Sequence, residues 1–168
     1  MVNEQGADRG YTLAEVMLTV AIVGILGAVG SQTYLQMDRY FILSRARVEL
    51  QEEARAAMYV MTRALHQASM ATIIIDRDAA TQPFYSRVAF SKVQGTSMKF
   101  KQSGTSLIMV AGTDNTILSK NLRYLAFTFP RSDDLSIISV SFTLEKTIYQ
   151  GQKKAVHMAS EKVQVMNP

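Results

Sequence analysis

The sequence predicts an α+β protein in which one long N-terminal α-helix packs on an antiparallel β-sheet. Three observations lead to this fold class. No charged residue occurs from Val16 to Met37. Beyond Asp38, apolar residues recur at helical spacings, and from Val88 onward they alternate with a period of two. The helix is therefore expected to have a membrane half and an amphipathic half.

Composition limits the classes of protein to consider. A chain of 168 residues is long enough for one domain of ordinary size. Its 18 basic and 14 acidic side chains give a net charge of +4, which aids contact with an anionic membrane or nucleic acid but requires neither. The sequence contains no cysteine, so disulfides and thiolate metal sites are excluded. An exported domain of this kind must be stabilised by its core alone.

The uncharged segment from Val16 to Met37 has the length of a membrane span. Its 22 residues would extend about 33 Å as a helix, close to the thickness of a bilayer's hydrocarbon core. A buried core helix is an alternative, although such a run is uncommon in so small a domain. A secretory signal peptide fits less well, because Glu15 rather than a basic residue stands at the start of the run. A membrane anchor is the preferred interpretation.

Glu15 stands where the uncharged segment begins. An unpaired carboxylate is costly to bury in lipid, so such residues usually have a partner and a function. The dipole of a helix favours an anion at its N-terminus. The alternative is a carboxylate that stays hydrated among the lipid headgroups. The residues next to Glu15 favour the first interpretation.

The segment around Glu15 resembles the prepilin processing signal of type IV pilins and type II secretion pseudopilins. It reads Arg9-Gly10-Tyr11-Thr12-Leu13-Ala14-Glu15-Val16. In that family a glycine precedes the cleaved bond. An aromatic residue, threonine, leucine, a small or apolar residue and glutamate follow, and then a long apolar helix. All these features occur here at the same spacing, and the motif covers the N-terminal fifth of the chain.

The resemblance implies a processing step and a division of the chain. Prepilin peptidase would cleave between Gly10 and Tyr11 and methylate the new amino group of Tyr11. Residues 1–10 would be a leader peptide that stays on the cytoplasmic side. Residues 11–37 would form the transmembrane and filament-core helix, and residues 38–168 an extracytoplasmic domain with the pilin-like fold.

Glu15 and three glycines are the residues expected to act in assembly. The resemblance implies that Glu15 pairs with the N-terminal ammonium of a neighbouring subunit, and the two charges would compensate each other when buried together. Gly24, Gly27 and Gly30 would let neighbouring helices approach closely. Small residues are also simply tolerated in membrane helices, and this alternative stays open for the glycines.

The resemblance favours a low-copy subunit. Many major pilins have a proline part-way along the apolar helix and a cysteine pair near the C-terminus. This chain has no proline before Pro83 and no cysteine. We therefore expect a minor pilin or pseudopilin, most similar to the J-type minor pseudopilins of type II secretion, that starts or caps a filament. The alternatives are a major fibre-forming pilin and a membrane-anchored extracytoplasmic binding module.

The resemblance also gives a location and a set of partners. The chain would cross the inner (cytoplasmic) membrane once, with a cytoplasmic N-terminus and an extracytoplasmic domain, and would then enter a pilus or pseudopilus. Its partners would be prepilin peptidase, other pilin or pseudopilin subunits, the inner-membrane assembly platform and membrane lipid. No phosphate-binding loop or nucleophile motif occurs, so we expect no enzyme activity, no cofactor and no metal. Nucleic acid is not an expected partner.

Residues 38–71 are expected to continue the helix with one apolar face. The apolar stripe consists of Tyr40, Leu43, Leu50, Ala54, Ala57, Met58, Met61, Leu65 and Ala68. The opposite face carries Arg45, Glu49, Glu52, Arg55 and Arg63. No proline or glycine interrupts the chain from Ser31 to Gln82, so the simplest prediction is one helix from about Thr12 to about Ala71.

Residues 88–166 are expected to form the sheet. Alternating apolar residues occur at Met98 and Phe100, at Leu125, Phe127 and Phe129, at Ile138, Val140, Phe142 and Leu144, and at Val163 and Val165. Turn signals that contain glycine, proline or aspartate separate these runs, the last of them Gln150-Gly-Gln152. We predict five to seven antiparallel strands, with one face covering the helix stripe and the other polar.

The remaining polar residues have ordinary explanations. His66 and His157 lack neighbours that suggest a metal or a catalytic base, and both are interpreted as surface residues. The loops at Asp76 and Asp78, at Asp114 and Asn115, and at Asp133 and Asp134 are interpreted as turns rather than calcium sites. A basic patch of Lys92, Lys99, Lys101, Lys120 and Arg123 is explained equally well by a solvated strand face.

Overall fold

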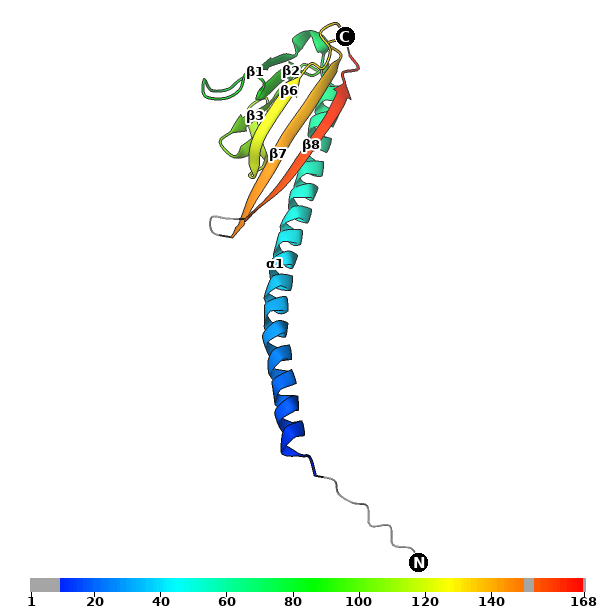
Figure 1. Cartoon of the computed structure of the whole chain (residues 1–168). Coiled ribbons are helices and arrows are strands. Elements are labelled where there is room, and N and C mark those ends of the chain that lie inside the picture. Colours follow the sequence, from blue (N-terminus) through cyan, green and yellow to red (C-terminus); the bar gives the residue numbers. More distant parts are fainter. Residues whose placement is uncertain (1–9, 150–152, 168) are drawn as a thin grey trace, which may run out of the picture. The chain divides into compact units, whose positions relative to one another are not determined.

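The computed structural model describes residues 10–149 and 153–167. The chain divides into two compact units, Met1–Ile42 and Leu43–Pro168. Helix α1, Leu13–His66, contributes to both units, and the eight strands belong to the second (Figure 1). The predicted fold class is confirmed, since a long N-terminal helix is followed by antiparallel sheets.

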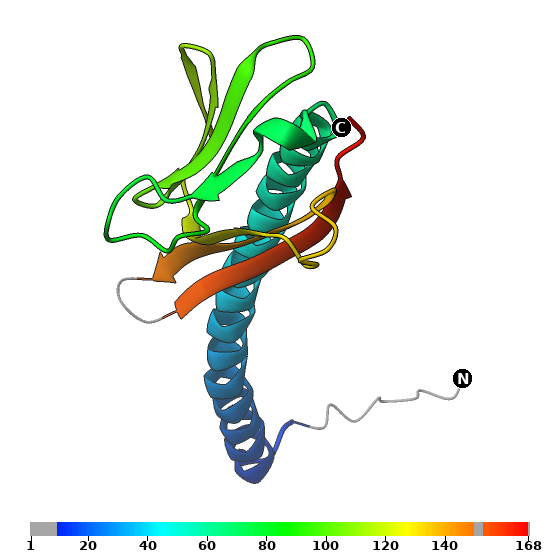
Figure 2. The same ribbon diagram turned by 90° about the horizontal axis from the view of Figure 1, so that it is seen from above.

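The second unit contains two antiparallel sheets. The five-stranded sheet has the order β1 (Ile74–Asp76), β2 (Arg87–Ser91), β3 (Ser97–Ser103), β4 (Ser106–Ala111) and β5 (Asp114–Ser119). The three-stranded sheet has the order β6 (Leu122–Thr128), β7 (Ile137–Tyr149) and β8 (Lys153–Gln164). A short 3₁₀-helix, η1 (Met70–Thr72), connects α1 to β1. Figures 1 and 2 both show β7 and β8 running across the C-terminal half of α1.

The prediction of a single sheet is wrong, although the seven strands β2 to β8 of the described residues agree with the five to seven expected in residues 88–166. The break falls at Lys120 and Asn121, between β5 and β6. Glu53 of α1 holds this connection, because its carboxylate accepts hydrogen bonds from the Asn121 side-chain amide at 2.9 Å and from the Lys120 backbone N–H at 3.3 Å. The chain therefore turns toward the helix, and β6 pairs with β7 instead of extending the first sheet.

Both sheets and α1 share one hydrophobic core. The helix contributes Ala46, Leu50, Ala54, Ala57, Met58, Met61, Ala64 and Leu65. From β7, the predicted residues Ile138, Val140, Phe142 and Leu144 are all fully buried. Phe100 of β3 and Phe127 of β6 are buried with them, so each sheet directs its alternate apolar side chains inward. Met58 and Met61 are core residues, as predicted.

Two predicted boundaries of the helix differ from the structure. Tyr40 was placed in the buried stripe, but its side chain is 67% exposed because the second unit begins only at Leu43. The helix ends at His66 rather than near Ala71, because Ala68 forms a bridge with Lys92. The side-chain amide of Asn167 also donates to the His66 carbonyl at 3.1 Å, which satisfies a group at the helix end.

The limits of the sheet region also differ. Strand β1 lies before the predicted start at Val88 and is too short, at three residues, to give a periodic signal. Strand β8 begins well before Val163, where the alternation had predicted the last strand. Gly104 and Gly112 confirm two of the predicted turns, since both have positive φ values, 58° and 62°, between consecutive strands. The predicted turn at 150–152 lies outside the described residues.

We expect truncation of Leu65 to lower the stability of the domain strongly. This side chain is fully buried, so Leu65→Ala should lower the free energy of unfolding by about 2–5 kcal/mol through lost burial and a residual cavity. Val48→Ala on the same helix is the control, since Val48 is 50% exposed. Chemical denaturation of the full chain in detergent, followed by near-ultraviolet circular dichroism of the tyrosines, measures both. Equal losses from the two variants would contradict the assigned core.

Candidate processing and assembly segment

The bond between Gly10 and Tyr11 lies just before helix α1. Both residues are exposed and neither is helical, and the side chain of Tyr11 is 88% exposed. The helix begins two residues later, at Leu13. A peptide bond in exposed, non-helical backbone can enter a protease site without unfolding secondary structure. The rest of the predicted leader, residues 1–9, lies outside the described residues.

Thr12 and Glu15 form a capping box at the start of α1. The Glu15 carboxylate Oε2 accepts hydrogen bonds from the Thr12 backbone N–H at 2.9 Å and from the Thr12 hydroxyl at 3.0 Å. In return, the Glu15 backbone N–H donates to the Thr12 hydroxyl oxygen at 3.3 Å. This reciprocal pattern satisfies backbone donors that the first helical turn leaves free. The Thr-x-x-Glu signal is present in the sequence, but the sequence analysis missed it.

The capping box uses only one oxygen of the Glu15 carboxylate. Oε1 has no hydrogen-bond partner among residues 10–149 and 153–167. Glu15 also lines an open hollow of about 440 Å³ on the helix surface, together with Tyr11, Val16, Leu18 and Thr19. Glu15 and Tyr11 therefore line the same open space.

The helix that follows presents an apolar surface on all sides. It is long and apolar enough to cross a membrane, and nothing in the described part of the chain covers its apolar segment. The few hydroxyl groups there bond back to the helix: Thr19 donates to the Val16 carbonyl at 2.8 Å, Ser31 to Ala28 at 3.0 Å and Thr33 to Val29 at 3.0 Å. Such internal bonds let polar side chains enter an apolar medium.

The three glycines of this segment leave open space beside the helix. A Cβ atom added at Gly24, Gly27 or Gly30 would meet no atom within 4 Å among the described residues. Nothing inside the chain therefore requires glycine at these positions. Their predicted role in close packing against neighbouring helices stays a prediction.

Residues 6–31 match the family model described as the prokaryotic N-terminal methylation motif. This match indicates a type IV pilin-like protein of a pilus or a secretion pseudopilus. It covers 26 of the 168 residues and ends inside the apolar part of α1. No curated protein and no solved structure gives a significant match to the chain.

The motif and the helix together support the coarser predictions made from the sequence. The motif implies processing by prepilin peptidase and other pilin subunits as partners. With one long apolar N-terminal helix, it supports single-pass anchoring in a membrane. The motif says nothing about residues 32–168, so the role of the domain has to be argued from the structure.

The two histidines, His66 and His157, lie in different elements, α1 and β8. Within the described residues, no group of three or more His, Asp or Glu side chains could hold a metal ion. His66 was predicted to lie on the exposed face of the helix, but it is half-buried. Its Nδ1–H donates to the Gln164 carbonyl at 2.8 Å, because the end of β8 packs beside α1 at this point. His157 lies in β8 and is also half-buried.

The acidic loop at Asp76 and Asp78 is neutralised by basic residues of the same sheet. Arg87 of β2 forms ion pairs with both carboxylates, to Asp78 at 2.9 Å, and Lys101 of β3 pairs with Asp78 at 2.8 Å. Hydrogen bonds from Arg87 lower the pKa of Asp76, and hydrogen bonds from Lys101 and Arg87 lower the pKa of Asp78. The loop is therefore an ion-pair network, with its carboxylates already occupied.

Asp114 and Asn115, which were interpreted as a turn, are instead the first residues of β5, where they pair with Ala111 and Val110. Asp134 accepts a hydrogen bond from the Ser136 backbone N–H at 2.9 Å at the entry to β7, which is a turn contact. Asp133 pairs with Arg131 at 2.8 Å. Of the proposed basic patch, Lys101 pairs with Asp78 and Arg123 pairs with Glu145. These two ion pairs neutralise part of the positive charge of the basic patch within the domain.

The ion-pair network predicts a pH-dependent contribution to stability. Arg87→Gln should lower the free energy of unfolding by the order of 1 kcal/mol near neutral pH, because these groups are partly exposed. The lowered pKa values of Asp76 and Asp78 mean that this contribution is complete above the ordinary value of 3.8 and is lost as the pH falls through the folded values. The difference between wild type and variant should therefore shrink below about pH 4.

Denaturation of the full chain in detergent at several pH values measures this difference. Arg55→Gln is the control, because Arg55 is exposed and forms no ion pair within the described residues. An Arg87 effect that stays constant down to acid pH would contradict the network.

Proposed function

We propose that this chain is a minor pilin or pseudopilin that starts or caps a filament of a type II secretion system or a type IV pilus. One observation carries the proposal: one carboxylate oxygen of Glu15 has no partner within the described residues, and it lies at the start of the exposed apolar part of α1. A carboxylate in this position needs a donor when the helix enters an apolar bundle. A neighbouring subunit is the natural source of that donor.

Cleavage between Gly10 and Tyr11 creates the required group. It converts the Tyr11 amide into a free amino group, which prepilin peptidase then methylates and which stays cationic. In the filament this ammonium lies against Oε1 of Glu15 in an adjacent subunit. Burying either charge alone in the apolar core would cost much free energy, and pairing offsets this cost. Because the two groups must meet, the pair fixes the axial position of one subunit relative to the next.

The apolar half of α1 serves first as a membrane anchor and then as the filament core. Its surface suits both environments, since its hydroxyl groups are satisfied internally. Gly24, Gly27 and Gly30 allow close approach of neighbouring helices in the filament. The N-terminus is cytoplasmic, and the domain from Leu43 onward lies outside the cytoplasm and acts by contacts rather than by catalysis.

A minor role is favoured over a major one by the form of the helix. No proline occurs within α1 and the chain has no cysteine, in contrast to many major pilins. The J-type minor pseudopilins are the subgroup that it resembles most. A major fibre-forming subunit is the second candidate, and the amount of the chain in sheared filaments distinguishes the two. An anchored extracytoplasmic binding module is the third.

Processing is the first prediction of this proposal. Co-expression with a prepilin peptidase should yield a chain that begins at Tyr11 and carries one added methyl group, measured by intact mass. Gly10→Val is the control and should leave the chain uncleaved, because the processing signal requires glycine before the cleaved bond. A wild-type chain that keeps residues 1–10 would favour the anchored binding module.

Substitution of Glu15 tests the pairing role separately from the capping role. Glu15→Gln keeps a side chain that can complete the capping box but removes the charge. It should be cleaved and inserted normally, yet reach sheared filaments in several-fold lower amounts, measured by quantitative immunoblot. Thr12→Val removes the capping hydroxyl and keeps the carboxylate, so it should enter filaments almost as well as wild type.

The opposite pattern would overturn the pairing role. Normal incorporation of Glu15→Gln would show that the charge is dispensable. A loss with Thr12→Val equal to the loss with Glu15→Gln would assign the effect to helix capping instead.

A further inference from the structure

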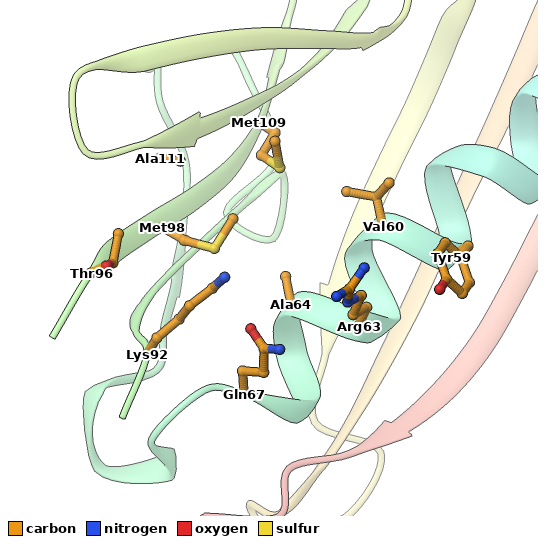
Figure 3. A pocket seen from close by; sticks show the side chains of 10 residues that line it. All are labelled: Tyr59, Val60, Arg63, Ala64, Gln67, Lys92, Thr96, Met98, Met109 and Ala111. Atoms are coloured by element: carbon orange, nitrogen blue, oxygen red, sulfur yellow. The ribbon is translucent and has the colours of Figure 1, made fainter. Parts of the chain in front are cut away.

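Two adjoining hollows form a groove beside the C-terminal end of α1. The first, of about 340 Å³, is lined by Tyr59, Val60, Arg63, Ala64, Gln67, Lys92, Thr96, Met98, Met109 and Ala111 (Figure 3). The second, of about 220 Å³, is lined by His66, Gln67, Lys92, Val93, Gln94 and Asn167. Gln67 and Lys92 line both, so the hollows lie next to each other. We call them together the α1 groove.

The first hollow has an apolar floor. Val60 and Ala64 of α1 face Met98 of β3 and Met109 of β4 across it (Figure 3). Met98 and Ala64 are buried, while Val60 and Met109 are half-buried. Methionine side chains are flexible and adapt to the shape of what they contact. The volume lies at the small end of the range of about 300–1,000 Å³ that is typical of ligand sites, and suits one or two apolar side chains.

Two cations line this floor without an anionic partner. Arg63 of α1 and Lys92, which follows β2, form no ion pair with any residue in the described part of the chain. Lys92 is half-buried, whereas Arg63 is exposed. Elsewhere in the domain Arg87, Lys101 and Arg123 are paired with carboxylates, while Arg55 and Lys99 are exposed and form no ion pair within the described residues. The α1 groove therefore fits an anionic group beside an apolar one.

The second hollow, next to the first, has a larger polar share in its lining. Gln67 and Gln94 bring side-chain amides, which can donate to and accept from a peptide backbone. His66 and Asn167 are held there by their contacts with Gln164 and with the helix end. Amides next to an apolar hollow suit an extended chain better than a compact ligand or a lipid tail.

We infer that the α1 groove binds a short extended segment of a partner protein, in which an apolar side chain lies next to a carboxylate. The apolar side chain enters the first hollow, between Val60 and the two methionines. The carboxylate pairs with Arg63 and Lys92, and the backbone continues over Gln67 and Gln94. The site involves neither Glu15 nor the apolar half of α1. The binding of a peptide to the groove is therefore tested independently of the proposed assembly role.

A defined set of peptides tests this inference on the full chain in detergent micelles. Each acetylated and amidated heptapeptide contains one leucine and one glutamate, spaced one to three residues apart in a serine and glycine background. Each has a counterpart with glutamine in place of glutamate, and a third series carries a free C-terminal carboxylate instead of the glutamate. Fluorescence anisotropy of the labelled peptides gives the dissociation constants.

At least one carboxylate peptide should bind about tenfold more tightly than its uncharged counterpart, as expected for a charge-assisted contact. The double variant Arg63→Gln, Lys92→Gln should lose this difference. Arg55→Gln, Lys99→Gln is the matched control, because it has the same net charge and alters exposed residues that do not line the groove. This control should bind like wild type. Unchanged thermal unfolding of both double variants excludes a folding defect.

Three results would overturn the inference. The first is that no carboxylate peptide, with an acidic side chain or a free C-terminus, is preferred over its uncharged counterpart. The second is a preference that survives in the Arg63→Gln, Lys92→Gln variant. The third is an equal loss in the matched control, which would indicate a general charge effect in place of a site.

Discussion

The carboxylate of Glu15 must keep hydrogen-bonding partners at the edge of an apolar helix, and the N-terminal unit is organised around this constraint. Thr12 supplies two donors to one carboxylate oxygen and so sets the first residue of α1. The other oxygen has no partner within the described residues, and the helix after it offers none, because its hydroxyl groups bond to its own carbonyls. The single chain can therefore leave this oxygen hydrated only near a membrane surface. Deeper burial requires a donor from another molecule.

In the second half of α1, apolar side chains are buried by other parts of the same chain. From Leu43 onward one apolar face of the helix is covered by the two sheets, and several of its polar side chains bond to the strands. Glu53 fixes the connection between the sheets, Thr62 donates to Glu161 of β8, and His66 donates to the Gln164 carbonyl at the end of that strand. One continuous helix thus meets two different surroundings, and the change falls within a few residues of Leu43.

The sequence predicted those features that depend on local pattern. The uncharged run, the helical stripe and the strand alternation gave the correct fold class, and the residues around Glu15 gave the processing segment, which the methylation motif supports.

Contacts between residues that are distant in the sequence could not be predicted. The helix end depends on Ala68 and Asn167, the split into two sheets depends on Glu53, and β1 has too few residues for a period. The α1 groove is also invisible in the sequence, because its lining comes from α1, β3, β4 and the residues beside Lys92.

The distribution of ion pairs connects the two candidate interaction sites. Several charges around the sheets have partners: Arg87 and Lys101 with the acidic loop, Arg123 and Lys154 with Glu145, and Lys146 with Glu49. Other basic residues, such as Arg55 and Lys99, are exposed and form no ion pair within the described residues. Arg63 and Lys92 differ in lying next to an apolar hollow, and the Glu15 oxygen that has no partner within the described residues lies next to an apolar helix. In both places an unpaired charge adjoins apolar surface, which is the combination that a complementary partner stabilises most and that water alone stabilises least. The contacts that complete this fold are therefore expected to come from other chains.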